Sequence, residues 1–270
     1  MVVQHNLSAM NTNRQMGVVT SALQKSTEKL SSGYKINRAG DDAAGLSISE
    51  KMRSQIRGLN KASDNAQDGI SLIQVAEGAL NETHSILQRM NELATQAAND
   101  TNTSVDRQSI KDEIEQLNEE LDRISTTTQF NKQDLLTGGF SGKLQVGALE
   151  GQTMDVKISL AVSAKGLKVS AVEVSTNAKA GTAMKSIQDA IESVSKQRSK
   201  LGAIQNRLEH TINNLDTNAE NTQAAESRIR DTDMADEMVQ YSKNNILSQA
   251  GQSMLTQANQ QTQGVLSLLQ

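Results

Sequence analysis

The sequence predicts a mainly α fold, in which both ends of the chain form a long antiparallel helical bundle or coiled coil with a small β-hairpin insert. None of the 270 residues is proline, the residue that most often breaks helices. Apolar residues also recur at every seventh position, as in the run Met52, Leu59, Ala66, Ile73, Leu80, Leu87 and Ala94. Because a seven-residue repeat places one narrow apolar stripe along a helix, each such helix needs another helix to cover it.

The composition argues against a compact enzyme. The chain has no Trp, no Cys, two Tyr and two Phe, so aliphatic side chains must fill the core. A formal charge of −4 indicates neither nucleic-acid nor anionic-membrane binding, and no apolar run of about 20 residues predicts a membrane span. The absence of cysteine excludes disulfides and thiolate chemistry.

The N-terminal half predicts three helices. The first, over about 5–32, carries Ala9, Met16, Leu23 and Leu30 at seven-residue spacing and ends at Ser31-Ser32-Gly33. Asp41 and Asp42 stand at N-cap positions of a second helix that reaches about Ala98, and a third follows over about 104–128. Glycines interrupt the second helix and allow close helix contact, at Gly58, Gly69 and Gly78.

The pattern changes between about 130 and 180, where glycines punctuate short alternating runs. Residues 144–146 and 154–158 predict strands, and 169–174 is a weaker candidate. This segment is too small for an independent sheet domain, so we expect it to lie on the helices.

The C-terminal part returns to helical spacing. From Gly181 to about 225, one stripe comprises Ile187, Val194, Leu201, Leu208 and Leu215. Asp231, Asp233 and Asp236 then predict the start of a last helix, and caps explain them better than a calcium loop, which needs a glycine and a distant glutamate. The final stripe includes Leu247, Met254, Val265 and Leu268.

The stripes of the two terminal helices have the fewest partners within the chain. We therefore expect these helices to be largely disordered in a monomer and to mediate self-assembly. The expected self-assembly residues are Ala9, Met16, Leu23, Leu30, Leu247, Met254, Val265 and Leu268.

No catalytic constellation is evident in the sequence. His5, His84 and His210 belong to no metalloprotease pattern, and neither a nucleophile motif nor a phosphate loop is present. We expect no enzyme activity, no cofactor and no metal site. A histidine at a partly buried helix interface is the simpler interpretation of His84.

Dense motifs at both ends resemble bacterial flagellin over essentially the whole chain. They are LSSGYKINR at 30–38, DDAAGLSIS at 41–49, NAQDGIS at 65–71, RIRDTDMADE at 228–237 and ILSQAGQSML at 246–255. The resemblance implies a filament subunit with an inner tube made by residues 1–42 and 229–270. The helical shell then comprises residues 43–130 and 181–228, with the β-hairpin insert at 131–180 and no large variable outer domain.

The resemblance also implies partners and a location. The subunit forms a helical homopolymer outside the cell after passing through the flagellar type III export apparatus, with a chaperone that holds its C-terminal segment. Filament cap and junction proteins are its other flagellar partners. The run QRMNEL at 88–93 and KDEI at 111–114 look like the surface bound by the flagellin-sensing Toll-like receptor of vertebrates, with Arg89, Leu93 and Glu113 at contact positions.

Two other interpretations are open at this point. A hook–filament junction protein resembles flagellin at both ends but usually diverges in the motifs quoted above. A coiled-coil adaptor or receptor ligand would form a small closed oligomer rather than an open polymer.

Overall fold

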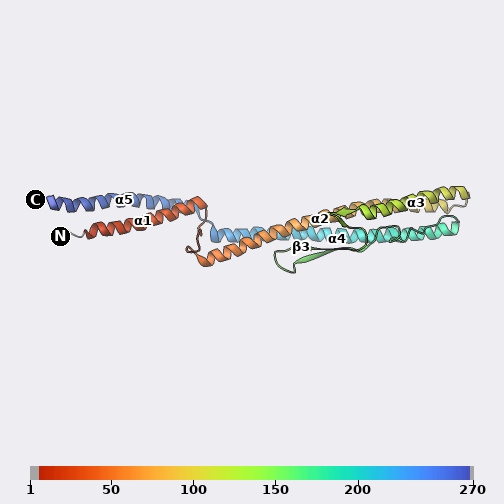
Figure 1. Ribbon diagram of the computed structural model, residues 1–270, viewed down its shortest axis with the longest axis horizontal. Helices are drawn as coiled ribbons and strands as arrows, with labels where there is room; N and C mark the ends of the chain where they lie inside the picture. The colour runs from red at the N-terminus through yellow and green to blue at the C-terminus, as the bar shows by residue number, and fades with distance from the viewer. Residues whose placement is uncertain (1–5, 268–270) are drawn as a thin grey trace. The chain divides into compact units, whose positions relative to one another are not determined.

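The computed structural model describes residues 6–267, with side chains up to residue 261 (Figure 1). The described helices are α1 (Leu7–Ser32), α2 (Ala43–Ala97), α3 (Ser104–Thr127), α4 (Asn177–Arg230) and α5 (Met234–Ser267). The strands are β1 (Gln129–Phe130), β2 (Gln133–Asp134), β3 (Phe140–Gln145) and β4 (Thr153–Ile158). Two compact units result, which we call the terminal unit (6–54 and 221–267) and the central unit (55–220). None of these helices is long and apolar enough to cross a membrane.

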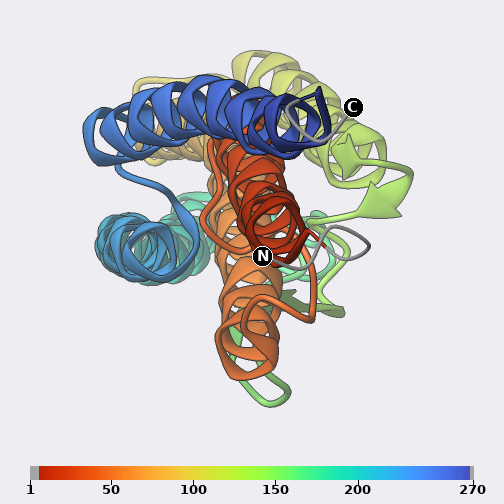
Figure 2. The same cartoon turned by 90° about the vertical axis from the view of Figure 1, so that its left-hand side faces the viewer.

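The terminal unit pairs the two ends of the chain. Helix α1 lies antiparallel beside α5 (Figures 1 and 2). The side chain of Asn6 caps α1 by accepting a hydrogen bond from the Ala9 amide at 3.0 Å. Gly33 ends α1 as predicted, because its φ of 75° is left-handed and its amide bonds to Lys29 O.

The two aspartates before α2 have different roles. Asp42 Oδ1 accepts a hydrogen bond from the Gly45 amide at 2.9 Å, which confirms the predicted cap. Asp41 instead accepts hydrogen bonds from the amides of Asn37 and Arg38 and so closes the connector before the helix. These hydrogen bonds from backbone amides hold the pKa of Asp41 below its usual range, and the one from Arg38 has the largest effect.

The heptad positions form the core of the central unit. The α2 positions Leu59, Ala66, Ile73, Leu80, Leu87 and Ala94 are all buried, as are Ile187, Val194, Leu201, Leu208 and Leu215 of α4. Leu59 and Leu215 pack in a small separate cluster, and the other heptad residues form the main core cluster, which buried residues of α3 such as Ile114 and Leu121 join. The predicted helix-on-helix packing is therefore confirmed, with α3 as a third member.

Two β-hairpins complete the central unit. Strands β3 and β4 pair antiparallel from Phe140↔Ile158 to Gln145↔Thr153, and alternate β4 side chains belong to the helical core. The shorter β1–β2 hairpin escaped prediction. Its turn residues Asn131 and Lys132 both have positive φ, which suits a two-residue hairpin, but two-residue strands show no sequence period.

Two of the three predicted glycines in α2 make room for the β3–β4 hairpin. A Cβ on Gly58 would lie 2.8 Å from the Cβ of Ala148, and one on Gly69 would collide with the Leu144 side chain. Nothing lies within 4 Å of such a Cβ at Gly78. The expected close helix contact is thus wrong for Gly78. At Gly58 the close neighbour is the β3–β4 hairpin, and at Gly69 both this hairpin and Leu208 of α4, at 3.5 Å, lie close.

Two boundaries and one strand differ from expectation. Helix α4 begins at Asn177 rather than Gly181 and ends at Arg230 rather than near 225. The Thr176 hydroxyl caps it by accepting from the Lys179 amide at 3.3 Å. Residues 169–174 form no strand: a turn at 170–171 is flanked by irregular backbone, although Val169 and Val174 are buried.

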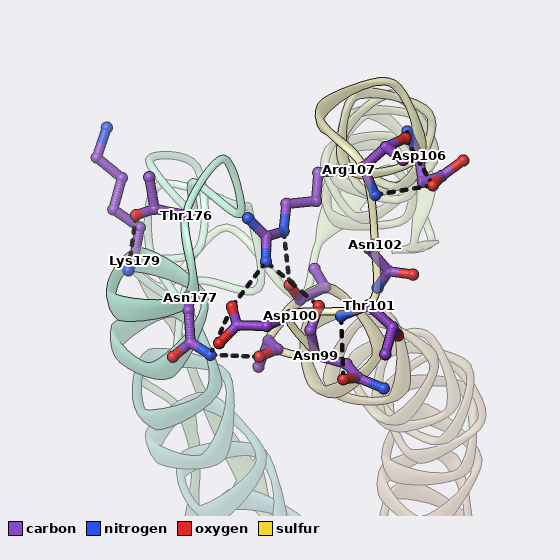
Figure 3. Close-up of polar contacts among 12 residues, drawn as sticks. Asn99, Asp100, Thr101, Asn102, Asp106, Arg107, Thr176, Asn177 and Lys179 are labelled. Carbon is purple, nitrogen blue, oxygen red and sulfur yellow. Dashed lines mark hydrogen bonds and ion pairs between the residues drawn. The ribbon is translucent and has the colours of Figure 1, made fainter.

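Side chains from three segments close the C-terminal end of α2 (Figure 3). Arg107 of α3 donates to Ala97 O at 3.1 Å and to Asn99 O at 3.2 Å, and it pairs with Asp100. Asn177 of α4 donates to Ala98 O at 2.6 Å. Carbonyls left without helical partners are thus satisfied, and the ends of α2, α3 and α4 are fixed together.

Candidate assembly and recognition surfaces

The seam between α1 and α5 is made largely of small and polar residues on the α5 side. The half-buried α5 positions mostly recur every three or four residues and comprise Glu237, Tyr241, Asn244, Asn245, Ser248, Gly251, Leu255 and Ala258. Met16 of α1 lies beside Gly251. Because Gly, Ser and Ala bury little apolar area, this seam stabilises the pair less than a leucine stripe would.

Large apolar side chains lie on other faces of the same two helices. On α5, Val239 and Ile246 are 66% and 67% exposed. On α1, Leu7 and Met10 are 71% and 64% exposed, and Val18 follows on the same face. A helix with apolar residues on several faces is typical of a buried position in an assembly.

The expected self-assembly residues divide into two groups. Ala9, Met16, Leu23 and Leu30 are half-buried on the α1 side of the seam, so their nearest partner belongs to the same chain. Leu247 and Met254 are exposed on α5. The side chain of Val265 and all of Leu268 lie outside the described part of the chain. The predicted stripes do not include Leu7, Met10 and Val18 of α1, nor Val239 and Ile246 of α5, which are seven residues apart but lie on a different face from Leu247 and Met254.

Arg230 forms a cluster with Tyr34, Ser49, Glu50 and Glu226 that joins the connectors of the terminal unit, and we call it the Arg230 cluster. Arg230 lies 4.7 Å from the centre of the Tyr34 ring and donates to Glu50 Oε1 at 2.8 Å. The buried Ser49 accepts a hydrogen bond from Arg230 at 3.4 Å and donates to Glu226 at 2.8 Å. Backbone hydrogen bonds from Lys35 N to Arg230 O and from Thr232 N to Gly33 O tie the two chain segments together.

The predicted receptor residues lie on α2 and α3 of the central unit. Arg89 Nε and Nη2 bond to Glu113 Oε1 at 3.0 and 2.9 Å, and Nη1 reaches Glu92 at 3.3 Å. The hydrogen bond to Glu113 has the largest effect and that to Glu92 the next largest, and both raise the pKa of Arg89, which is therefore positively charged in solution. Leu93 is 2% exposed and belongs to the core, so only Arg89 and Glu113 of the three are at the surface.

The described residues contain no group of three His, Cys, Asp or Glu side chains placed to hold a metal ion. His84 contacts Gln88 at 3.0 Å on its own helix, and His210 has no carboxylate partner within residues 6–267. His5 lies outside this range.

Comparisons with known proteins agree on one family. The model of the bacterial flagellin N-terminal helical region matches residues 3–141, and that of the C-terminal helical region matches 184–269. The chain is 56% identical to a flagellin of Halalkalibacterium halodurans and 52% identical to a flagellin of Bacillus subtilis, in each case over 100% of both chains. It is also 49% identical to flagellin FlaB2 of Treponema pallidum, again over both full lengths.

Solved structures share the fold. The crystal structure of Bacillus cereus flagellin is 34% identical, with a TM-score of 0.51 over 60% of this chain and 94% of that one. A putative flagellar hook-associated protein from Vibrio parahaemolyticus has a TM-score of 0.61 at 14% identity, over 71% of this chain and all of that one, and shows the fold alone. The family matches and the full-length relatives place this chain in the bacterial flagellin family, whose members are structural proteins of the extracellular flagellar filament.

Proposed function

We propose that this chain self-assembles into the flagellar filament through the outer faces of α1 and α5. The exposed apolar residues on these faces are the observation that carries the proposal. Full burial of one large apolar side chain is worth about 1.5–3 kcal/mol, and α1 and α5 together offer several such side chains. The central unit, by contrast, has already buried its heptad stripes. Its role is mechanical rather than catalytic.

In this arrangement residues 1–42 and 229–270 form the inner tube. Residues 43–130 and 181–228 form the shell around it, and 131–180 is an insert on that shell. Since only residues 159–176 lie between β4 and α4, the filament should have a thin, smooth wall.

The assembly proposal is tested by seeding. Purified monomer is mixed with filament fragments, examined by electron microscopy and digested briefly with protease. Long tubular filaments in which both chain ends become protected are expected. A small closed oligomer that never elongates would favour a coiled-coil adaptor instead. Added junction protein should cap the filament fragments and stop elongation, whereas this chain should extend them. That difference would distinguish a filament subunit from a junction protein.

The same exposed face of α5 supports a role in export. We propose that the flagellar export chaperone covers the C-terminal segment until the unfolded chain enters the type III export apparatus, because apolar residues exposed in the cytoplasm promote aggregation. Filament cap and junction proteins then contact the subunits at the two ends of the polymer. A peptide spanning residues 231–270 should bind the chaperone, and failure to bind would contradict this step alone.

The Arg89–Glu113 pair supports a second role in recognition by the vertebrate Toll-like receptor. An arginine at a protein interface often contributes more than 1 kcal/mol of binding, and the side chains of Arg89 and Glu113 are 51% and 44% exposed. Leu93 supports this surface from the core beneath it.

Replacing Arg89 by Ala should weaken binding of monomer to the receptor ectodomain by about tenfold. Arg53→Ala is the matched control, because Arg53 also lies on α2 and pairs with a glutamate three residues away. Equal binding by both variants and the unmodified chain would end the receptor proposal without affecting the filament role.

A further inference from the structure

Charge is distributed unevenly along the two terminal helices. Arg14 is the only charged side chain in residues 6–24 and 244–270 together. Apart from Glu28 of α1, which pairs with Arg38, the acidic side chains gather at the start of α5 and comprise Asp231, Asp233, Asp236 and Glu237. A lone charge in an otherwise uncharged surface is costly to bury unless the assembly supplies a partner.

Arg14 lies on the outer face of α1. Leu7, Met10, Arg14 and Val18 follow one another at helical spacing, and all four are exposed. The guanidinium donates to Asn11 Oδ1 at 3.0 Å, and no carboxylate of residues 6–267 forms an ion pair with it. If this face becomes buried between copies, the partner of Arg14 must come from another copy.

Asp236 is the acidic side chain in the first turn of α5 that is available for such a contact, whereas Asp231 lies in the connector before this helix. Glu237 pairs with Lys29 at 3.4 Å, and Asp233 caps α5 by accepting from the Ala235 and Asp236 amides. The exposed carboxylate of Asp236 forms no hydrogen bond or ion pair within the described part of the chain. Asp236 also shares one strip of α5 with Lys243, seven residues later.

Arg14 and Asp236 cannot meet within one copy. Asn6 bonds to Ala258 O at 2.9 Å and Lys29 pairs with Glu237, and these two contacts fix the antiparallel register. In this register Asp236 is level with residue 30, about 24 Å along the helix from Arg14 at 1.5 Å per residue.

The stagger between copies decides which charges meet. An unshifted neighbour would bring its Lys243 within about 3 Å of the level of Lys25, and both are exposed lysines that repel each other. A neighbour shifted by about 24 Å brings Asp236 level with Arg14 instead. The same shift places Val239 of the neighbour near Met10, so apolar side chains flank the ion pair.

We propose that Arg14 of one copy pairs with Asp236 of a second copy, displaced by about 24 Å along α1, and that this pair fixes the stagger of neighbouring terminal units. The inference rests on the proposed filament role and adds a specific lateral contact to it. Charge pairs of this kind fix register because the wrong stagger opposes like charges.

A charge swap tests the pair. Arg14→Glu and Asp236→Arg should each raise the critical concentration for seeded elongation at least about tenfold, and the double variant should return to within about threefold of the unmodified chain. Lys165→Glu, an exposed reversal in the central unit, is the control and should elongate normally. Circular dichroism of each monomer checks that the helices are retained.

The elongation assay separates failure of the Arg14–Asp236 pair from failure of the filament role. Elongation of both single variants at the unmodified rate would overturn the pair, and so would a double variant as defective as the singles. If the unmodified chain itself forms no polymer, the filament role fails, which is a different result from failure of the pair alone.

Cross-linking measures the same contact directly, since the chain contains no cysteine. Filaments of an Arg14→Cys, Asp236→Cys double variant, treated with a short bifunctional maleimide, should yield a ladder of covalent oligomers. Each single variant has one thiol and can yield dimers at most. Polymerised double variant without species larger than a dimer would contradict the proposed stagger.

Discussion

The central and terminal units treat their large apolar residues in opposite ways. In the central unit Leu80, Leu87 and Leu201 are fully buried among α2, α3 and α4. In the terminal unit Leu7, Ile246 and Met254 are each more than half exposed. The central unit thus covers its large apolar residues with its own contacts, whereas the terminal unit leaves several exposed, which is the basis of the proposed contacts between copies.

The largest effect is expected from a leucine in the central core. Leu201→Ala should lower the free energy of unfolding of the monomer by about 2–5 kcal/mol, because it leaves a cavity at a fully buried position. Leu247→Ala, on the exposed face of α5, should change it by less than about 0.5 kcal/mol while impairing filament elongation. Urea denaturation measures both, and equal losses in the two variants would remove the distinction between the units.

Arg107 should contribute somewhat less. Its side chain is only 16% exposed and satisfies two carbonyls at the end of α2. Arg107→Ala should lower the free energy of unfolding of the monomer by about 1.5–3 kcal/mol. Amide exchange should accelerate most near the α2–α3 turn. Arg123→Ala is the control, since among the described residues Arg123 forms an ion pair only with Glu120, on the exposed side of α3. A smaller loss of stability in Arg107→Ala than in Arg123→Ala would contradict the role of Arg107 at the end of α2.

Two glycines of α2 provide a matched comparison within the central unit. Gly69→Ala should destabilise the monomer by about 1–3 kcal/mol, because the new methyl group meets Leu144 of the β3–β4 hairpin. Gly78→Ala meets nothing within 4 Å and should stabilise the helix by up to about 1 kcal/mol. Thermal unfolding of both variants checks the opposite signs; the same sign for both would contradict the packing described.

The smallest effect concerns acid and the Arg230 cluster of the terminal unit. The hydrogen bond from Arg230 holds the pKa of Glu50 below its usual value. A depressed folded-state pKa stabilises the fold above the unfolded pKa of about 4.3, and this stability is lost as the pH falls through the lower, folded value. Proteolysis around residues 226–236 should therefore increase as the pH falls below about 4, and Glu50→Gln should reduce that dependence. An identical acid response in this variant would argue against the cluster.

The sequence predicted the heptad core and most helix boundaries because a buried stripe at fixed spacing is a local signal. Burial of Leu80, Leu201 and their heptad neighbours follows from that spacing alone. The strand expected at 169–174 failed because alternation reports burial, and no partner strand was available there. The caps by Thr176 and Arg107 depend on residues that only the folded chain brings together.

The residues of the candidate surfaces were harder to predict from the sequence than the residues of the core. A search for seven-residue spacing finds the seam side of α1 but not the outer face, where Leu7, Met10 and Val18 follow steps of three and eight residues. Leu93 matched a motif, yet the fold buries it. The Arg230 cluster joins residues 180 positions apart, so no local pattern could have indicated it.

Amide hydrogen exchange of monomer and filament compares the two units most directly. In the monomer, α1 and α5 should exchange far faster than the buried segments of α2 and α4, because their seam is thin and their outer faces are uncovered. In the filament, exchange in α1 and α5 should slow to the range of the central unit, whose own rates change little. Helices α1 and α5 that are already as protected as α4 in the monomer, or that gain no protection in the filament, would contradict the dependence of the terminal unit on other copies.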